Sequence, residues 1–484
     1  MTAPCPHAPR SGSNCWRVEN AARASVIIDA EDYFRFARSA MLKATRRIML
    51  IGWDFDARID LGRSAEAEDA PVHVGEFISW LVDRTPELEV YLLRWDLGAL
   101  KTIMRGTTLL TIARWMRHTR IHTRLDSQHP IGASHHQKIV VIDDCFAFCG
   151  GIDMTGDRWD TRQHRDKDPG RHQPGGKPYK PWHDATTALE GRVAAALGEH
   201  ARDRWRRAGG ASLEAVTGKT DCWPDELAPQ FRDVAVAIAR TAPAMPGQDA
   251  VFEIETLYID QIASAARYIY AESQYFASRR VAEAIARRLD EEDGPEIVVI
   301  NPLTAQGWLE PIAMDTARAR LMEALRRRDH HGRLRMYHPH TAAGAPIYVH
   351  AKILIVDDRL VRVGSSNINN RSMRLDTECD VSIDAAHQSA PGIQTMIADI
   401  RNDLLAEHLG STMAVVADTI EECGSLIGAI ERLRTDGKSL QPYVAPDLGD
   451  IEAWLADNEV LDPEGPDEMF ETLSRRGLFR RWRR

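Results

Sequence analysis

The sequence predicts an α/β protein built from two fused homologous halves, related by a pseudo-twofold axis, with the active site at their interface. Two observations support this fold class: a 15-residue segment recurs without a gap, and amphipathic segments alternate with short apolar segments around both copies. The 484-residue chain is 44% hydrophobic and 27% charged, which suffices for a buried core. We expect each half to be an α/β/α sandwich with a mixed β-sheet, followed by a helical C-terminal extension.

The recurring segment is the strongest feature of the sequence. Residues His136–Gly150 and His350–Gly364 align at an offset of 214 residues, and the intervening positions remain apolar in both, as a buried strand requires. Such self-similarity indicates an internal duplication. The identical pairs are His136/His350, Lys138/Lys352, Ile139/Ile353, Asp143/Asp357, Asp144/Asp358 and Gly150/Gly364.

The duplication extends upstream of the recurring segment. An amphipathic stretch, Tyr33–Arg47, leads into the apolar run Ile48–Ile51, and Tyr258–Arg267 leads into Tyr268–Ala271 in the same way. A helix followed by a buried strand is the alternation expected of a sheet covered on both faces.

Downstream, a carboxylate opens a short apolar strand in each half. Asp184–Glu190 matches Glu378–Asp384, although the first carboxylate lies 48 residues after its histidine and the second only 28. We assign the difference to a polar insert, Thr161–Lys180, which predicts a loop.

These segments divide the chain into four parts. We expect the first half at residues 15–208, a linker at 209–229, the second half at 230–410 and a C-terminal extension at 411–484. The second half begins with the strand-like segment Val234–Arg240, and the extension begins with a helix over Val415–Arg434.

Charge and cysteine content indicate the compartment and the partners. The formal charge of −10 argues against a nucleic-acid partner. Seven scattered cysteines favour a reducing cytosol, and the Cys145/Cys149 spacing is more typical of small apolar residues on a strand than of a metal site. No apolar run approaches the roughly 20 residues of a spanning helix, and we expect no signal peptide.

The end of the chain separates into two charge blocks. Asp447–Glu471 holds ten acidic residues and no basic ones, whereas Arg475–Arg484 holds six arginines interleaved with Leu478, Phe479 and Trp482. The basic block is either an interfacial anchor for anionic lipid or a tail that folds onto the acidic block. We therefore expect a cytoplasmic protein with peripheral contact at the inner membrane face. The sequence leaves the oligomeric state open.

The motif H-x-K-x-x-x-x-D points to phosphoryl chemistry. His136 and Lys138 lie two residues apart on a strand, so both side chains leave the same face. Two copies place two imidazoles and two ammonium groups around one site, where lysines neutralise phosphoryl oxygens and histidines attack and protonate. A metal bound at the same place is disfavoured because lysine is no ligand and repels a cation.

The two copies resemble the HKD motifs of the phospholipase D superfamily, and the flanking segments strengthen the resemblance. The second copy continues in a manner similar to the family's G-S-x-N-x-N-x-R-S and D-x-E signatures, and the first is similar to G-G-I-D and G-R-W-D of the bacterial and eukaryotic-type branch. The segments that carry this are Gly364–Ser372, Leu375–Asp380, Gly150–Asp153, Gly156–Asp160, Pro181–Asp184 and Ile269–Phe276.

The resemblance implies two displacements at a phosphodiester through a covalent phosphohistidine, with neither metal nor cofactor. On this chain His136 would be the nucleophile and His350 the general acid and base, while the pseudosymmetry leaves the reverse order open. The residues that would surround them are Lys138, Lys352, Asn367, Ser365, Gly150 and Gly151 for the phosphoryl group, and Asp184 and Glu378 for orienting the histidines. Asp143 and Asp357 belong to the catalytic motif, but their position seven residues along the strand indicates a structural role.

Two positions depart from the family pattern. Asn367 aligns at the 214-residue offset with Asp153, and an ionised Asp cannot donate a hydrogen bond to a phosphate. Ser273 stands where the family usually has Asn.

The resemblance leaves several substrates open. We expect hydrolysis of glycerophospholipids to phosphatidic acid and a head-group alcohol, with transphosphatidylation through the same intermediate. A cardiolipin synthase-like phosphatidyltransferase is the alternative, disfavoured by the lack of apolar membrane segments. A nuclease-type phosphodiesterase ranks third because the chain is acidic, and a non-enzymatic binding role ranks below it because both motifs are intact.

Overall fold

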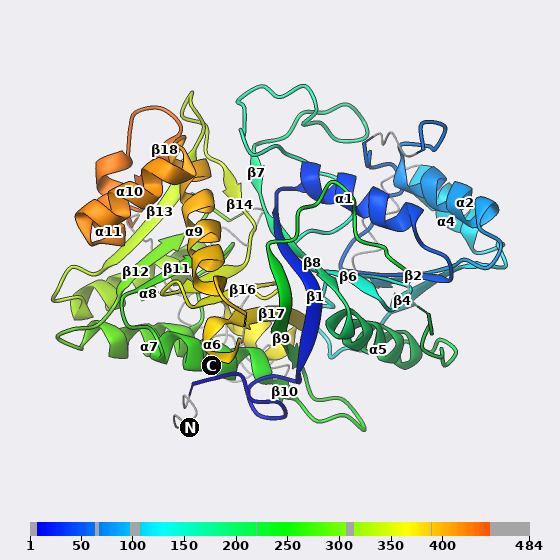
Figure 1. Ribbon diagram of the computed structural model, residues 1–484, viewed down its shortest axis with the longest axis horizontal. Helices are drawn as coiled ribbons and strands as arrows, with labels where there is room; N and C mark the ends of the chain where they lie inside the picture. The colour runs from blue at the N-terminus through cyan, green and yellow to red at the C-terminus, as the bar shows by residue number, and fades with distance from the viewer. Residues whose placement is uncertain are drawn as a thin grey trace, which may run out of the picture.

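Within the described residues a mixed β-sheet of 16 strands runs through both halves of the molecule, with helices on both sides (Figure 1). The computed structural model describes residues 7–62, 67–96, 107–218, 220–305, 314–388 and 390–445. The acidic and basic blocks at the end of the chain, 447–471 and 475–484, lie outside these ranges.

The first half alternates strands and helices as predicted. Its insert, Thr161–Lys180, contains no helix or named strand among the described elements and is a loop. The elements are β1 (Arg17–Ile28), α1 (Ala30–Leu42), β2 (Arg47–Gly52), α2 (Val74–Arg84), β3 (Glu89–Trp95), α4 (Thr107–Trp115), β4 (Ile121–Asp126), β5 (Ile139–Ile142), β6 (Phe146–Gly150), β7 (Trp182–His183), β8 (Ala185–Glu190) and α5 (Arg192–Arg207).

The second half repeats this order and is followed by two helices and a strand. The elements are β9 (Phe231–Ala242), β10 (Val251–Phe252), α6 (Glu253–Ala263), β11 (Tyr268–Glu272), α7 (Arg279–Leu289), β12 (Glu296–Ile300), α8 (Thr316–Arg328), β13 (Leu334–His340), β14 (Tyr348–Val349), β15 (Ile353–Val356), β16 (Leu360–Gly364), the π-helix η2 (Arg371–Leu375), β17 (Glu378–Asp384), the 3-10 helix η3 (Ala385–His387), α9 (Ile393–Leu409), α10 (Met413–Cys423), α11 (Leu426–Leu433) and β18 (Ser439–Pro442).

Strand order shows that the two halves share one topology. From the centre outward the first half runs β1-β8-β6-β5-β2-β3-β4, and the second runs β9-β17-β16-β15-β11-β12-β13 with β18 at its edge. In both halves the outer strands, β2-β3-β4 and β11-β12-β13, are parallel, and the inner strands are antiparallel. The predicted pair of fused mixed-sheet halves is confirmed, and the two sheets are continuous with each other.

The seam between β1 and β9 carries the pseudo-twofold axis. Arg17 pairs with Ile238, and Ala24 pairs with Phe231. Adding the 214-residue offset to Arg17 and Ala24 gives positions 231 and 238, so exchanging the halves converts the first pair into the second. The antiparallel register therefore obeys the same symmetry as the duplicated sequence.

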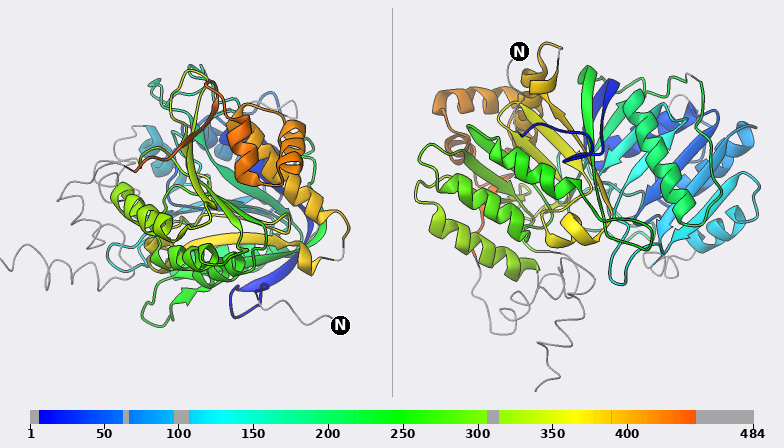
Figure 2. Two further views of the ribbon diagram at one scale, coloured as in Figure 1. Left: turned by 90° about the vertical axis from the view of Figure 1, so that its left-hand side faces the viewer. Right: turned by 90° about the horizontal axis from the view of Figure 1, so that it is seen from below.

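The helices bury their apolar faces in three main clusters. Those of α5 and α9 pack into one core that crosses the seam, whereas α1, α2 and α4 pack on the first half and α6, α7 and α8 on the second. Figure 1 shows α5 opposite α1, α2 and α4. Figure 2 shows the green helices α6, α7 and α8 side by side across the second half. Amphipathic helices on both faces make each half the predicted α/β/α sandwich.

The C-terminal extension differs from the sequence prediction in one detail. The single helix expected over Val415–Arg434 is two helices, α10 and α11. Gly424, with φ of +60°, ends α10 in the left-handed region, and the Ser425 side chain accepts a hydrogen bond from the Gly428 N–H to begin α11.

Cys145 and Cys149 do not face a common point. The Cys145 sulfur lies 3.9 Å from that of Cys222, while the Cys149 sulfur lies 3.8 Å from that of Cys379 across the seam. All four are free thiols, and Cys149 is buried in β6 as predicted.

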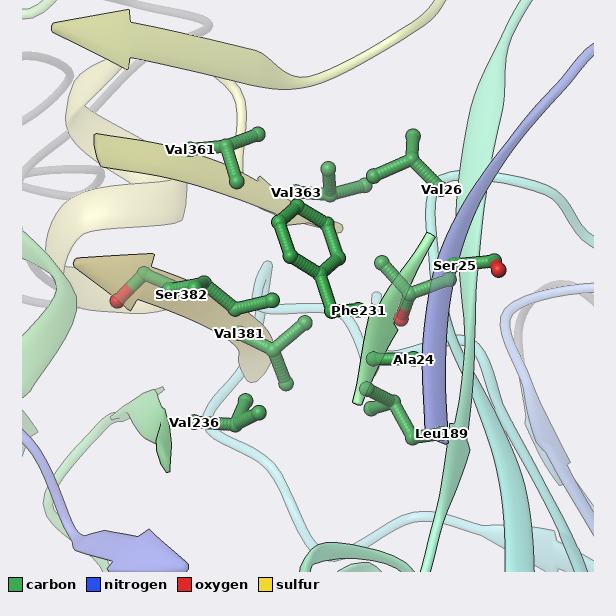
Figure 3. Close-up of a pocket in the computed structure, with 12 residues that line it drawn as sticks. Ala24, Ser25, Val26, Leu189, Phe231, Val236, Val361, Val363, Val381 and Ser382 are labelled. Carbon is green, nitrogen blue, oxygen red and sulfur yellow. The ribbon is translucent and has the colours of Figure 1, made fainter. Parts of the chain in front are cut away.

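An apolar pocket beside the seam is distinct from the predicted site (Figure 3). Its polar lining residues are three hydroxyl side chains, and no titratable side chain is among the lining residues, so it offers no catalytic chemistry. The lining is Ala24, Ser25, Val26, Thr187, Leu189, Phe231, Val236, Val361, Val363, Val381, Ser382 and Ile383.

Candidate active site

Each motif histidine is held in place by the opposite half of the molecule. The His136 N–H donates to the Thr377 carbonyl at 2.9 Å, and the His350 N–H donates to the His183 carbonyl at 2.7 Å. These contacts continue short parallel pairings across the two halves, β7 with β14 and His135 with Thr377. The backbone thus brings the two histidines to one site at the interface.

The two predicted orienting carboxylates contact the histidines in a crossed arrangement. Glu378, from the second half, lies 3.0 and 3.1 Å from the Nδ1 atom of His136. Asp184, from the first half, lies 2.7 Å from the Nδ1 atom of His350. Because Nδ1 is engaged in both rings, Nε2 is the nitrogen that each presents to a substrate.

Both carboxylates are fixed by further contacts. The hydroxyls of Ser365 and Ser372 donate to Glu378, the latter at 2.7 Å. The Ala185 N–H donates to Asp184 at 2.9 Å. A Cβ atom at Gly151 would lie 2.4 Å from an Asp184 oxygen, so this position requires glycine.

Three predicted phosphate-binding residues therefore act in other contacts in this structure. Ser365 holds Glu378, and Gly151 makes room for Asp184. Gly150 allows β6 to approach β8, since a Cβ atom there would lie 2.4 Å from the Thr186 Cα. Asn367 is buried, and its Oδ1 atom has no hydrogen-bond partner among the described residues. A contact to a phosphoryl oxygen would come from its Nδ2 N–H groups, because Oδ1 is an acceptor.

The two motif lysines lie beside the histidines but in unlike surroundings. The Lys138 Nζ donates to the His136 carbonyl at 2.6 Å and forms an ion pair with Asp153 at 3.3 Å. The Lys352 Nζ donates to the His350 carbonyl. Asp153 also accepts from the Trp53 N–H at 3.0 Å.

Burial and the lysine charges keep both histidines neutral. Burial lowers the pKa of His136 well below its usual value, and Lys138 and Lys352 lower it further. The pKa of His350 falls for the same reasons, with Lys352 as the cation. Burial also lowers the pKa of Lys352 to about 7. An anionic phosphodiester would offset the lysine charges and so favour imidazole protonation once bound.

The two carboxylates differ in their electrostatics. Burial raises the pKa of Glu378 well above its usual value. Burial has the same effect on Asp184, but His350 and Lys352 outweigh it and hold the pKa of that carboxyl below its usual range. Asp184 is therefore an ionised partner for His350, whereas Glu378 favours its neutral form.

Asp143 and Asp357 lie away from the catalytic histidines. Each accepts hydrogen bonds from three successive backbone N–H groups that lead into the adjacent strand: Asp143 from residues 45–47 and Asp357 from residues 266–268. In this structure the two aspartates therefore hold backbone, which agrees with the structural role that their spacing indicates, and they do not contact the catalytic histidines.

Two tryptophans are additional members of the site. The Trp182 ring centroid lies 5.1 Å from that of His350, and the Trp53 centroid lies 6.5 Å from that of His136. Trp182 lies within the segment Pro181–Asp184 that carries the resemblance, and Trp53 closely follows the apolar run Ile48–Ile51, so these positions were the available signal.

None of the helices among the described residues has the length and hydropathy needed to cross a bilayer.

Comparison with known proteins gives a consistent family. Residues 258–400 match a family model described as "Cardiolipin synthase, PLD-like domain". The chain is 25% identical to phospholipase D alpha 1 of Carica papaya, covering 78% of this chain and 63% of that protein. It is 25% identical to phospholipase D1 of Schizosaccharomyces pombe, covering 87% of this chain and 37% of that one. The chain thus spans less than two thirds of these relatives.

Solved structures support the fold. Phosphatidylserine synthase from Haemophilus influenzae Rd KW20 superposes with a TM-score of 0.53 at 13% identity, covering 79% of this chain and 86% of that chain. The family model and the curated relatives, together with the two crossed histidine–carboxylate pairs, support the resemblance to the phospholipase D superfamily that the two motifs indicated.

Proposed function

We propose that this protein is a phospholipase D-type phosphodiesterase that hydrolyses glycerophospholipids to phosphatidic acid and a head-group alcohol. The observation that supports this most directly is the pair of imidazoles whose Nδ1 atoms are each engaged by a carboxylate, with a lysine beside each. This set supplies a nucleophile, a general acid and cations for a phosphoryl group.

In the first step, the Nε2 atom of His136 attacks phosphorus and the bond between phosphorus and the head-group oxygen breaks. His350, protonated at Nε2, gives its proton to that oxygen, so the alcohol leaves neutral. Ionised Asp184 stabilises the imidazolium that this role requires. For His136 to attack, its Nδ1–H must donate to Glu378, at 3.0 and 3.1 Å, which leaves the lone pair on Nε2.

In the second step, neutral His350 takes a proton from water, and the hydroxide attacks phosphorus. The bond between phosphorus and His136 breaks, releasing phosphatidic acid and restoring both histidines. Lys352 and Asn367 would hold the phosphoryl oxygens in both steps. An alcohol in place of water would give transphosphatidylation.

A phosphatidyltransferase of the cardiolipin synthase kind is the second candidate. The match of residues 258–400 to a family model of that description favours it. Mass spectrometry of products formed from mixed phospholipids, with and without glycerol or phosphatidylglycerol, distinguishes the two. Phosphatidic acid as the main product in every mixture supports hydrolysis, and a dominant phosphatidylated acceptor supports transfer.

Single-turnover kinetics test the roles of the histidines. A phosphatidyl ester of 4-nitrophenol has a leaving group that departs without protonation, so His350→Ala should release about one nitrophenolate per chain in a burst and retain the phosphatidyl group on His136. His136→Ala should give no burst, and the exposed His172→Ala should behave as wild type. A burst in His136→Ala, or full turnover in both variants, contradicts the proposal.

A further inference from the structure

A second cluster of titratable side chains lies behind the catalytic histidines. It consists of Asp29 at the end of β1, His164 in the insert loop, His183 in β7 and Glu407 in α9. All four are buried, and one potential ligand atom from each lies within 4.8 Å of the others. The active-site chemistry described above uses none of them.

Four contacts within this cluster lie close to the edge length of a tetrahedral coordination shell. Metal bonds of 2.0–2.1 Å give edges of about 3.3 Å between ligand atoms. The His183 Nδ1 atom lies 3.3 Å from Asp29 and 2.8 Å from Glu407. The His164 Nε2 atom is hydrogen-bonded to the same Glu407 oxygen at 2.9 Å and lies 3.5 Å from Asp29 Oδ2, whereas the 3.3 Å contact of His183 is to Asp29 Oδ1.

Two of these buried atoms lack a hydrogen bond although they are crowded. Neither the His183 Nδ1 atom nor the Asp29 Oδ2 atom has a partner in hydrogen-bonding geometry within the described ranges. At 2.8 Å from a carboxylate oxygen, His183 thus makes close contact without the alignment of a hydrogen bond. Buried donor atoms that are crowded together without hydrogen bonds are typical of ligands around an ion.

The other ring nitrogens are engaged as they are in metal sites. The Nδ1 atom of His164 lies 3.0 Å from Asp160, and the Nε2 atom of His183 lies 2.8 Å from Glu272. A carboxylate on the second nitrogen fixes the tautomer and makes the first a better donor. The two inner carboxylates carry the two negative charges that a divalent cation neutralises, which suits a buried site.

We propose that Asp29, His164, His183 and Glu407 form a closed structural site for a divalent transition-metal ion. Two imidazole nitrogens and two carboxylate oxygens in tetrahedral spacing match Zn²⁺. The ion would fasten the insert loop, β1 and β7 of the first half to α9 of the second. It lies apart from the lysine-lined phosphoryl site, where a cation is repelled, and takes no part in the two displacements.

The position of this site gives it a supporting role for the catalytic residues. His183 precedes Asp184, and its carbonyl accepts the hydrogen bond from the His350 N–H. The Asp184 N–H donates to Asp29 at 3.1 Å. Holding Asp29 and His183 therefore fixes the backbone of both members of one histidine–carboxylate pair.

Metal analysis of the full-length protein tests the site whatever reaction the enzyme performs. After incubation with Zn²⁺ and gel filtration, wild type should hold about one zinc per chain, whereas His164→Gln and Glu407→Gln should hold less than about a tenth. His172→Gln, an exposed histidine of the same loop, is the matched control and should bind zinc as wild type does. A wild-type protein without zinc, or zinc retained by both variants, overturns the proposal.

Cobalt substitution gives a second readout that needs no variant to fold. Wild type loaded with Co²⁺ should develop the intense visible absorption of tetrahedral cobalt with nitrogen and oxygen ligands, and Zn²⁺ should displace it. Chelation should lower the melting temperature of wild type and leave that of Glu407→Gln unchanged. A spectrum of octahedral cobalt would mean that the metal is not held by these four side chains. Equal melting temperatures of wild type with and without chelator would mean the same, and the four residues would then be a hydrogen-bonded cluster without an ion.

Discussion

The two halves of the molecule share one strand order and one motif, yet they build unlike sides of the active site. In the first half Asp153 pairs with Lys138 at 3.3 Å. In the second half the equivalent position is Asn367, whose Oδ1 atom has no hydrogen-bond partner in the described part of the chain. The two halves thus share one backbone fold, but the difference between Asp153 and Asn367 makes the positive charge beside Lys138 smaller than that beside Lys352. We infer that Lys352 and Asn367 bind phosphate more strongly than the Lys138 side.

The orienting carboxylates repeat this asymmetry. Asp184 has a lowered pKa and Glu378 a raised one, although the two residues occupy equivalent positions. The crossed arrangement places the ionised carboxylate from the first half on the histidine of the second. The first half therefore supplies the ionised carboxylate, Asp184, that contacts His350 of the second half.

Removing the two carboxylates separately should give the largest difference between the halves. Asp184→Asn removes an ionised partner from His350 and should lower kcat by about 10³-fold. Glu378→Gln replaces a group that favours its neutral form and should lower kcat by about 10- to 100-fold. Steady-state kinetics on a short-chain phosphatidylcholine measure both.

Circular dichroism and melting curves establish that both variants fold. A loss in Glu378→Gln equal to that in Asp184→Asn would mean that Glu378 is ionised in the working enzyme, and the inferred asymmetry would be wrong.

Substitutions at Asp153 and Asn367, the equivalent positions that differ between the halves, should change phosphate affinity by a smaller factor than the carboxylate substitutions change kcat. Asp153→Asn frees Lys138 and should lower the inhibition constant of inorganic phosphate about fivefold. Asn367→Asp places a carboxylate beside the phosphoryl group and should raise it about tenfold, since each charge interaction near a protein surface contributes on the order of 1 kcal/mol. Competitive inhibition at fixed ionic strength gives both constants.

Asp153 also accepts the backbone N–H of Trp53, and Asn at position 153 keeps an oxygen for this bond, so Asp153→Asn removes the charge and retains the hydrogen bond. Phosphate inhibition that is equal in wild type and both variants would show that the position does not contact the anion.

The sequence predicted the parts of the site that lie within one segment. His136 and Lys138, or His350 and Lys352, are neighbours on a strand, and the offset of 214 residues identified both pairs. The crossed contacts could not be predicted, because alignment matches Asp184 with Glu378 without saying which histidine each reaches. That choice depends on β7 pairing with β14 across the two halves.

The seam was not predictable for a related reason. β1 and β9 begin exactly one repeat offset apart, but Ala21 and Ala235 are their sole identical pair at that offset. Apolar patterning identifies a buried strand and does not specify its neighbour. The buried cluster of Asp29, His164, His183 and Glu407 was missed because its members come from four distant segments.

The pH dependence should sharpen the comparison of the two lysines. Lys352 holds phosphate only when protonated, and its pKa of about 7 means that kcat/KM should fall about fivefold between pH 7 and pH 8 as the proton is lost. Bound phosphate favours the charged lysine, so the alkaline limb of kcat should lie at higher pH. Lys352→Arg stays protonated at higher pH, so the alkaline limb of kcat/KM should move to higher pH. This shift is expected independently of any change in the maximal rate. A limb that is unchanged in Lys352→Arg would assign the titration to another group.

The smallest effect on catalysis should come from the two motif aspartates, whose roles are structural in both halves. Each has a positive φ, +49° at Asp143 and +48° at Asp357, and each accepts three backbone N–H groups. Replacement by Ala removes these acceptors and strains the backbone, so Asp143→Ala should lower the free energy of unfolding by about 2–3 kcal/mol. Asp357 is more exposed, so water replaces it better and Asp357→Ala should cost about half as much.

Asn tolerates the left-handed conformation and keeps one acceptor oxygen, so the Asn variants should recover part of the loss. Denaturant unfolding measures the stabilities, and kcat per folded molecule should stay within twofold of wild type. A hundredfold loss of kcat in a folded Asp143→Asn variant would return this residue to the catalytic set, and with it the simple interpretation of the motif as a chemical unit.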